Sequence, residues 1–261
     1  MEFDNKTYWN NRLENSYNLI GVGDITLSMN YNKWSYKVTK HVLKRLLKKY
    51  NDSANNEVLD IGSGTGFVVE ILQGLNKKVT GVDISSNAVR KLSVKFPESK
   101  FLNVDIGKEL LATPNNTYST CVASSVLYHI VADQELEFAL HNIHNALRPG
   151  GIFIFSDNFI HSDEYNVTHQ KCRTLDEYER FLASSGFAIV ERAPNYYLMN
   201  DPVDTKGKIL KYLWHFNCKF SRSSTLYDGL VWPSLYPIEL LLTRFWKESP
   251  AQEFMICRAQ K

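Results

Sequence analysis

Short apolar runs alternate with helical spacing through the middle of the chain. The apolar runs predict buried strands at 57–61, 78–83, 99–104, 120–125 and 152–156. Apolar residues at helical intervals predict connecting helices at 68–75, 86–96 and 134–146. Strands separated by helices in this order are typical of a parallel sheet with helices on both faces. The expected fold class is therefore α/β and doubly wound.

The later part of the chain continues this pattern. A helix at 175–185 is expected to end at Gly186, because glycine readily adopts the backbone conformation that closes a helix. Two closing strands are predicted at 188–192 and 253–258. A turn is predicted at 147–151, where a proline and two glycines precede the fifth strand.

Two segments rich in aromatic residues flank this alternation, a leader at 1–50 and an insertion at 195–250. Amphipathic helices are expected at 36–49 in the leader and at 238–245 in the insertion. Flat, rigid rings suit a pocket for an organic ligand or a cation, but they also pack flanking segments onto a core. Both interpretations stay open at this point. The expected organisation is an N-terminal helical lid at 1–50, a ligand-binding core at 51–194, a substrate cap at 195–250 and a final core strand at 251–261.

Composition and charge exclude several classes of protein. Hydrophobic residues make up 44% and charged residues 22% of the 261 residues, a balance that argues against disorder. The formal net charge of +2 is too small to indicate nucleic-acid binding, and the basic helix face at 37–48 is expected to be solvated. No apolar run is long enough to cross a bilayer, and no signal-peptide pattern opens the sequence. The four scattered cysteines lack metal-site spacing, so we expect a reduced, cytoplasmic protein.

A glycine loop follows the first predicted strand. Gly62, Gly64 and Gly66 let the backbone turn tightly and let a ligand approach the main chain. A dinucleotide fingerprint is GxGxxG, whereas these glycines follow GxGxG and Phe67 stands where the third glycine would be needed. Asp60, just before the loop, would repel a pyrophosphate and attract an ammonium group. The spacing therefore favours a ligand with an amino group over a dinucleotide.

Two further acids follow the next two strands. Asp83 ends the second strand, where a carboxylate can accept hydrogen bonds from both hydroxyls of a ribose. Asp105 follows the third strand and is placed to accept from an adenine amino group. Each acid alone is as readily a surface residue, but the ordered set indicates a nucleoside site.

These motifs resemble the class I S-adenosylmethionine-dependent methyltransferases. The matching stretches lie, in family order, at 58–67, 81–85, 103–106, 121–130 and 147–154. The resemblance implies a seven-stranded Rossmann-like sheet with one antiparallel strand and S-adenosylmethionine as the cofactor. The donor-binding residues that it implies are Asp60, Gly62, Ser63, Gly64 and Gly66 for the methionine part, Asp83 for the ribose, Ile84, Asp105 and Ile106 for the adenine, and Ser124 beside the amino-acid moiety.

The leader also resembles an N-terminal segment that folds over the donor in many small-molecule methyltransferases. Its matching parts are Tyr8-Trp9 and residues 31–36. The resemblance implies that Tyr31, Trp34 or Tyr36 covers the sulfonium or the carboxylate of the donor, without deciding among the three.

Acceptor chemistry is expected near the end of the fourth strand. If the acceptor is a hydroxyl, a base must take its proton, and His129 is the first candidate, with a structural histidine as the alternative. His169 is a weaker candidate. The residues expected to contact the acceptor are Tyr128, His161, Trp214, Trp232 and Tyr236.

Asp157-Asn158 looks like part of the magnesium site of catechol-type O-methyltransferases. Those enzymes also need an acid after the fourth strand, where this chain has Ser124-Ser125. A hard divalent cation requires more than one carboxylate, so no metal is expected. Residues 124–127 also differ from the signature of enzymes that methylate exocyclic base nitrogens, so no nucleic-acid partner is expected.

The sequence therefore indicates an enzyme that transfers a methyl group in line from S-adenosylmethionine to a small-molecule metabolite. Oxygen is the favoured acceptor atom, with nitrogen and carbon as alternatives. Two hypotheses from other classes stay open, a nicotinamide-dependent oxidoreductase and a non-catalytic S-adenosylmethionine-binding protein. The GxGxG spacing disfavours the first, and His129 with the aromatic cap disfavours the second.

Overall fold

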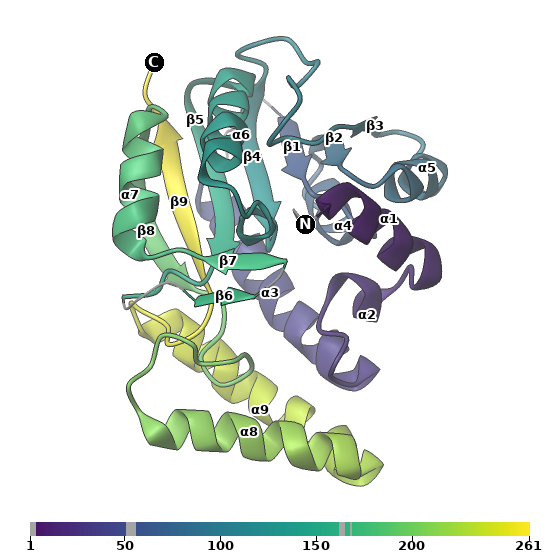
Figure 1. Cartoon of the computed structure of the whole chain (residues 1–261), viewed down its shortest axis with the longest axis vertical. Coiled ribbons are helices and arrows are strands. Elements are labelled where there is room, and N and C mark those ends of the chain that lie inside the picture. Colours follow the sequence, from purple (N-terminus) through teal and green to yellow (C-terminus); the bar gives the residue numbers. More distant parts are fainter. Residues whose placement is uncertain (1–3, 51–55, 162–164, 168) are drawn as a thin grey trace.

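A seven-stranded mixed sheet forms the centre of the molecule (Figure 1). The computed structural model describes residues 4–50, 56–161, 165–167 and 169–261. The strand order is β3-β2-β1-β4-β5-β9-β8. The strands are β1 (Glu57–Ile61), β2 (Lys78–Asp83), β3 (Lys100–Asn103), β4 (Tyr118–Ser124), β5 (Leu147–Asp157), β8 (Phe187–Pro194) and β9 (Glu253–Ala259).

Only β9 runs against both of its neighbours, β5 and β8, while β3, β2, β1, β4 and β5 pair in parallel. This confirms the predicted fold class and the single antiparallel strand. Short β6 (Tyr165–Val167) and β7 (Gln170–Cys172) form a separate hairpin. The carboxyl ends of the parallel strands meet at one edge, where ligands bind in such sheets.

Alternate residues of each strand point to opposite sides of the sheet, and apolar side chains lie on both sides. Helices therefore cover both faces. Val58, Val122 and Ile154 face the core cluster that includes α3, α4 and α5. Leu59 and Phe153 face the cluster that includes α6 and α7. The helices are α1 (Asn5–Asn15), α2 (Leu19–Val22), α3 (Met29–Lys49), α4 (Phe67–Gln73), α5 (Ser86–Lys95), α6 (Asp133–Ala146), α7 (Leu175–Ser184), α8 (Lys208–Ser223) and α9 (Thr225–Phe245), with a 3₁₀ turn η1 (Leu127–His129).

Three predicted boundaries were wrong, and one of them is that of the helix predicted at 238–245, which is only the end of α9. The turn predicted at 147–151 lies inside β5, because Leu147 already pairs with Tyr118 and the ladder resumes at Ile152. Gly150, with a φ of 71°, lets the intervening residues leave the ladder without ending the strand. The helix predicted at 36–49 begins at Met29, because Ser28 caps it by accepting from the backbone N–H of Tyr31 at 2.9 Å.

The leader and the insertion lie at different places around the sheet (Figure 1). Helices α1 and α2 lie beside the carboxyl ends of β1 and β2, and the predicted lid boundary at 50–51 adjoins a segment outside the described residues. Helices α8 and α9 form an antiparallel pair that contacts α3 through α9. Among the described residues, no helix is both long and apolar enough to span a bilayer.

Candidate active site

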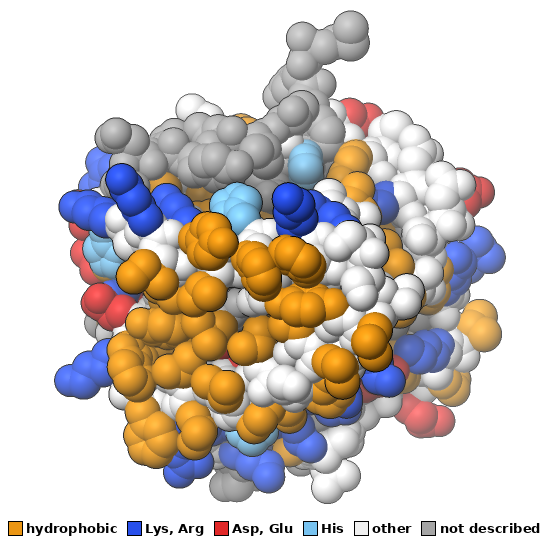
Figure 2. Space-filling model, turned by 90° about the horizontal axis from the view of Figure 1, so that it is seen from below, with side chains coloured by type: hydrophobic (Ala, Val, Ile, Leu, Met, Phe, Trp, Pro, Cys, Tyr) orange, Lys and Arg blue, Asp and Glu red, His pale blue; other side chains and the backbone are white. Residues whose placement is uncertain are grey.

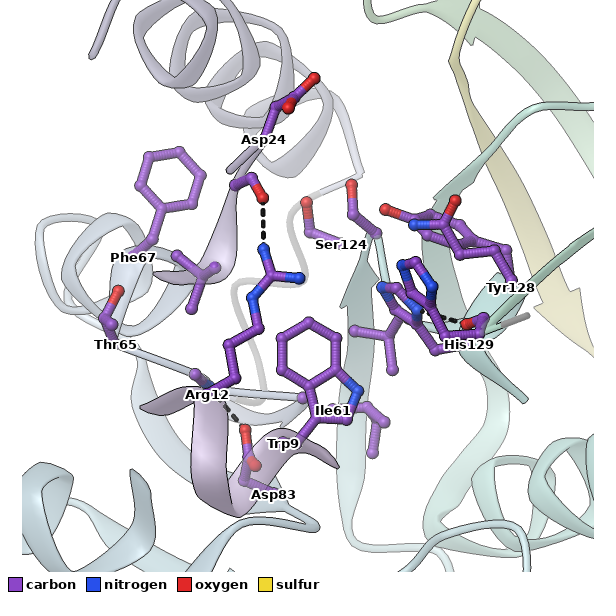
Figure 3. A pocket seen from close by; sticks show the side chains of 18 of the residues that line it. Trp9, Arg12, Asp24, Ile61, Thr65, Phe67, Asp83, Ser124, Tyr128 and His129 are labelled. Atoms are coloured by element: carbon purple, nitrogen blue, oxygen red, sulfur yellow. Dashed lines mark hydrogen bonds between the residues drawn. The ribbon is translucent and has the colours of Figure 1, made fainter. Parts of the chain in front are cut away.

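A cavity of about 660 Å³ opens at the carboxyl edge of the sheet, beneath the leader helices. Figure 3 shows Arg12 and Trp9 reaching into it from α1, between the side that holds Asp83 and the side that holds Tyr128 and His129. The structure brings most of the predicted donor residues into its wall. These are Gly62, Ser63, Gly64, Asp83, Ile84, Asp105, Ile106, Ser124, Tyr31 and Tyr36.

The glycine loop between β1 and α4 is held against β2. The backbone N–H groups of Gly62 and Ser63 both donate to the carbonyl oxygen of Val82, at 2.7 and 3.1 Å. Gly62 has a φ of 71°, and a Cβ there would lie 2.4 Å from Val126. A residue with a side chain would therefore be strained and would collide with the wall of the cavity. The loop conformation requires glycine, as its spacing predicted.

Asp60 lies directly behind this loop, outside the wall of the cavity itself. Its side chain is fully buried, and neither carboxylate oxygen has a hydrogen-bond partner among the described residues. The hydroxyl of Ser63 donates to the backbone carbonyl of Asp60 at 3.2 Å. Burial raises the pKa of Asp60 to about 8, partly opposed by the nearby Ser63 hydroxyl. A buried carboxylate without a partner fits a site that completes itself with a donor from a ligand, such as an ammonium group.

Asp83 at the end of β2 fastens the loop from the other side. One carboxylate oxygen accepts from the N–H of Gly64 at 2.7 Å, and the other accepts from the N–H of Ser85 at 2.8 Å. Burial raises the pKa of Asp83, and these two N–H groups oppose the rise. Each oxygen keeps a lone pair for a further donor, so the carboxylate can still bind two hydroxyls.

Ile84, Asp105 and Ile106 continue this wall beyond Asp83. One carboxylate oxygen of Asp105 accepts from the N–H of Gly107 at 3.1 Å, which fixes the side chain within its own turn. Apolar isoleucines on either side of an acceptor suit a flat heterocycle with an amino group. Gly66 does not line the cavity; it begins α4 with a φ of 89° and packs against Phe96.

His129 lies in η1 across the cavity from the loop. Its Nδ1 is 3.0 Å from the backbone carbonyl oxygen of His169. A carbonyl only accepts, so Nδ1 carries the proton and Nε2 is left with its lone pair. Burial lowers the pKa of His129 to about 3. The ring of Trp9 meets it edge-on at 4.9 Å between centroids. His129 is therefore a neutral proton acceptor at the cavity wall.

Arg12 is a cavity residue that the sequence pattern did not reveal. Its guanidinium donates to the carbonyl oxygens of Gly21 at 2.6 Å and Gly23 at 2.7 Å, and to the hydroxyl of Tyr8 at 2.6 Å (Figure 3). It also lies 5.0 Å from the ring of Trp9. Arg12 thus ties α1 to the segment after α2, which forms the roof of the cavity.

Replacing Arg12 with alanine is expected to release this roof and to weaken nucleoside binding about tenfold, because several charge-assisted hydrogen bonds are lost together. Limited proteolysis within residues 4–28 should become faster in the same variant. The matched control is Lys6→Ala, since Lys6 is an exposed residue of α1 outside the cavity. Unchanged affinity and unchanged cleavage in Arg12→Ala would contradict a role in holding the roof.

The aromatic leader residues divide between the cavity and the packing around it. Tyr36 lines the cavity, donates to the carbonyl oxygen of Val22 at 3.2 Å and packs edge-on against Phe67. Tyr31 also lines it and donates to the carbonyl oxygen of Met199 at 3.1 Å. Trp34 does not line it and instead packs at a tilt against Tyr236, with the Lys37 ammonium group over its face.

The predicted acceptor residues are only partly brought together. Tyr128 lines the cavity, whereas Trp214, Trp232 and Tyr236 do not. Trp214 and Trp232 pack around Tyr31 beneath the site, with ring centroids 5.8 and 4.8 Å from it. Their rings fill the junction between α3 and the α8–α9 pair. For these two residues, the aromatic flank serves packing and does not line a pocket.

His161 also lies outside the cavity wall, since its backbone N–H and its Nδ1 both bind the carboxylate of Asp204, each at 2.7 Å. The insertion reaches the cavity through residues before α8 instead, notably Asn200 and Asp201. Gln252, the residue just before β9, also lines the cavity. These polar side chains carry no motif, so only the folded chain reveals them.

Asp157, considered above as a metal ligand, is fully buried at the end of β5. It accepts from the backbone N–H of Asn158 at 2.6 Å and from the hydroxyl of Tyr178. Burial raises its pKa to about 7. Its carboxylate is thus engaged in closing the loop after β5 against α7.

Two features together define the class of this protein, namely the strand order with antiparallel β9 and the glycine loop that faces an acid at the end of β2. They are those of the class I S-adenosylmethionine-dependent methyltransferase fold. Residues 58–151 match the family model described as "Methyltransferase domain". This part of the chain is a methyltransferase domain.

Relatives of known sequence agree with this identification. An uncharacterized methyltransferase of Oceanobacillus iheyensis is 28% identical over 130 residues, which are 49% of this chain and 58% of that protein. The malonyl-[acyl-carrier protein] O-methyltransferase of Bacillus cytotoxicus is 28% identical over 124 residues, which are 46% of this chain and 41% of that protein. The chain thus spans about half the length of these two relatives.

Solved structures show the same fold at low identity. A Leishmania major S-adenosylmethionine-dependent methyltransferase superposes with a TM-score of 0.65 at 14% identity, covering 97% of this chain and 80% of that one. A Burkholderia thailandensis 1,6-didemethyltoxoflavin N1-methyltransferase, with its substrate and S-adenosylhomocysteine bound, superposes with a TM-score of 0.53 at 15% identity. That match covers 87% of this chain and 79% of the other.

Proposed function

We propose that the protein transfers the methyl group of S-adenosylmethionine to a small-molecule acceptor, and that the acceptor atom is oxygen. The observation that carries the proposal is a single cavity lined by the glycine loop, Asp83 and Asp105 on one side and by His129 on the other. A donor and an acceptor can therefore meet within one enclosed space, which is what an in-line displacement requires.

The donor side fits the parts of S-adenosylmethionine in order along the sheet edge. The ammonium group of the donor would supply the missing partner of Asp60, and its ribose hydroxyls would bind the remaining lone pairs of Asp83. The adenine would lie between Ile84 and Ile106, with its amino group toward Asp105. The GxGxG spacing of the loop, with Phe67 where a dinucleotide fingerprint needs its third glycine, disfavours a nicotinamide cofactor.

The tautomer of His129 supports oxygen as the acceptor atom, because it leaves Nε2 free to act as the base that a hydroxyl acceptor needs. When a hydroxyl oxygen attacks the methyl carbon, the O–C bond forms, the C–S bond breaks, and the oxygen becomes strongly acidic. The low pKa of His129 keeps its imidazole neutral, so the lone pair on Nε2 can accept the proton of this strongly acidic methylated oxygen. The Bacillus cytotoxicus relative is named an O-methyltransferase, which agrees with this assignment. Nitrogen is the second candidate, because the Burkholderia thailandensis neighbour is named an N1-methyltransferase.

Replacing His129 with alanine is expected to lower kcat by about a hundredfold or more without changing the affinity for S-adenosylmethionine, because proton transfer follows donor binding. With its pKa near 3, His129 stays neutral above pH 5. Protonation of His129 should therefore not lower kcat as the pH falls from 8 to 5. Protonation would abolish its role only as the pH falls toward 3.

Transfer of a labelled methyl group from S-adenosylmethionine into a metabolite extract is the assay, followed by chemical identification of the labelled product. His141→Ala is the matched control, since that histidine is exposed on α6, lies outside the cavity and contacts the carbonyl oxygen of Glu137 in its own helix. Turnover within twofold of the wild type in His129→Ala would remove His129 from catalysis. If no extract yields a labelled product, the proposed activity is contradicted and the protein is better described as a non-catalytic S-adenosylmethionine-binding protein.

A further inference from the structure

The outer face of the α8–α9 pair is unusually apolar for a surface (Figure 2). On α8, apolar side chains recur at three- and four-residue intervals and are exposed along one stripe, with Ile209 exposed at 75% and Tyr212 at 68%. The members of this stripe are Ile209, Tyr212, Leu213, Phe216 and Phe220. Opposite positions, such as Trp214 and Cys218, face inward, so the stripe is the side of the helix that the fold leaves uncovered.

Helix α9 presents a matching stripe. Its exposed apolar residues recur at similar spacing and continue into the next residue after the helix. They are Leu226, Leu230, Ile238, Leu241, Phe245 and Trp246. Figure 2 shows hydrophobic side chains gathered on this face into one patch, which we call the α8–α9 face. Patches of this extent on soluble domains usually mark a binding surface.

The exposed charges around the α8–α9 face are mostly positive. Exposed basic side chains border it, namely Lys208, Lys211, Lys219, Arg222, Arg244 and Lys247. The acids between residues 205 and 247 are Asp228 and Glu239, and both are buried. Asp228 accepts from Ser28 and Trp232, and Glu239 accepts from the backbone N–H groups of Tyr197 and Leu198. Exposed Asp201 and Glu248 lie just outside the two helices, so the face meets its surroundings with apolar groups and a mostly positive border.

We propose that the α8–α9 face docks on an anionic lipid bilayer, with its apolar stripes inserted at the interface and its basic border against the headgroups. Helices that lie in a membrane interface combine an apolar face with flanking lysine and arginine, and they carry aromatic rings at headgroup depth, as Tyr212 and Trp246 would be. The proposal does not depend on the methyltransferase activity.

A second copy of the chain fits this surface less well. A symmetric dimer would place the same patch against itself, so the basic borders of the two copies would face each other. The buried acids cannot offset that repulsion. An anionic bilayer instead complements both the apolar area and the charge.

Sedimentation of the full chain with phosphatidylcholine vesicles, with and without one third phosphatidylserine, tests the proposal. We expect binding to the anionic vesicles that weakens in high salt, and at least tenfold weaker binding to the neutral ones. Lys208→Glu/Lys219→Glu should lower anionic binding by at least tenfold, whereas the matched charge control Arg90→Glu/Lys100→Glu, on α5 and β3, should not.

The apolar contribution is tested by Leu241→Ser/Phe245→Ser, which should also lower vesicle binding by at least tenfold, against Val94→Ser on α5 as the matched control. All changed residues are exposed, so thermal midpoints should stay the same and exclude misfolding. No binding to anionic vesicles, or equal binding by the variants and the wild type, would overturn the proposal. Dimerisation that Leu241→Ser/Phe245→Ser abolishes, without vesicle binding, would assign the face to a second copy.

Discussion

Asp60→Asn is expected to weaken S-adenosylmethionine binding by about a hundredfold and yet to raise the thermal midpoint of the ligand-free protein. The reason is that the Asp60 carboxylate is buried without a partner until a ligand supplies one. Asparagine removes the buried charge, and with it the attraction for an ammonium group. Opposite effects on stability and binding are expected of a binding residue whose free form destabilises the fold.

The raised pKa of Asp60 gives this prediction a pH dependence with a defined sign. The folded-state pKa of about 8 lies above the ordinary aspartate value of 3.8, so the ionised carboxylate destabilises the fold increasingly as the pH rises from 4 to 8. The stabilisation by Asp60→Asn should therefore be largest near pH 9 and absent near pH 4. Thermal melts of both proteins across this range measure it.

The affinity for the ligand should also depend on whether Asp60 is protonated. At pH 6.5 the free Asp60 is mostly protonated, and an ammonium partner would favour its ionised form, so binding should release close to one proton. Affinity should then rise between pH 6 and 7.5, before the amino group of the ligand itself begins to lose its proton. Calorimetry in buffers of different ionisation enthalpy measures the release. Release that persists in Asp60→Asn would contradict the assignment, and the exposed Asp176→Asn is the control.

Asp83→Ala is expected to lower the affinity for S-adenosylmethionine by at least a hundredfold, because one carboxylate both fastens the loop and accepts from the ribose. It would lose the hydrogen bonds to Gly64 and Ser85 as well as those to the ligand. Glutamate at this position should recover little, since a longer side chain displaces the loop.

The nucleoside 5′-methylthioadenosine, which lacks the amino-acid part, separates the two acids. Asp83→Ala should weaken binding of this nucleoside as strongly as that of S-adenosylmethionine. Asp60→Asn should leave its affinity unchanged, because no ammonium group is present. Equal losses in both variants would show that the loop has collapsed as a unit, and would contradict the separate roles given to the two carboxylates.

The donor side of the site could be predicted from the sequence because its geometry is local. A strand, three glycines and the start of a helix fix the loop within ten residues, and the acid after the next strand must lie beside it in a parallel sheet. Asp83, Ile84, Asp105 and Ile106 were placed correctly at the cavity for this reason. Their roles toward a ligand remain predictions.

The roof and the acceptor side depend on how distant segments meet. Arg12 acts through carbonyl groups of its own leader, and Asn200 reaches the cavity from residues before α8, so neither belongs to a recognisable motif. Aromatic density did not distinguish a pocket from packing, and Trp214 and Trp232 proved to be packing residues. Helix α8 and its exposed stripe were not predicted. The three- and four-residue spacing of the apolar residues is present in the sequence, but only the fold shows that they face outward.

Titration of the full chain with S-adenosylhomocysteine, and separately with NAD, tests the central claim most directly. The loop, Asp60 and Asp83 together predict one molecule of S-adenosylhomocysteine bound per chain, with micromolar or tighter affinity, and no heat with NAD. Saturable binding of NAD, or no binding of S-adenosylhomocysteine at millimolar concentration, would contradict it.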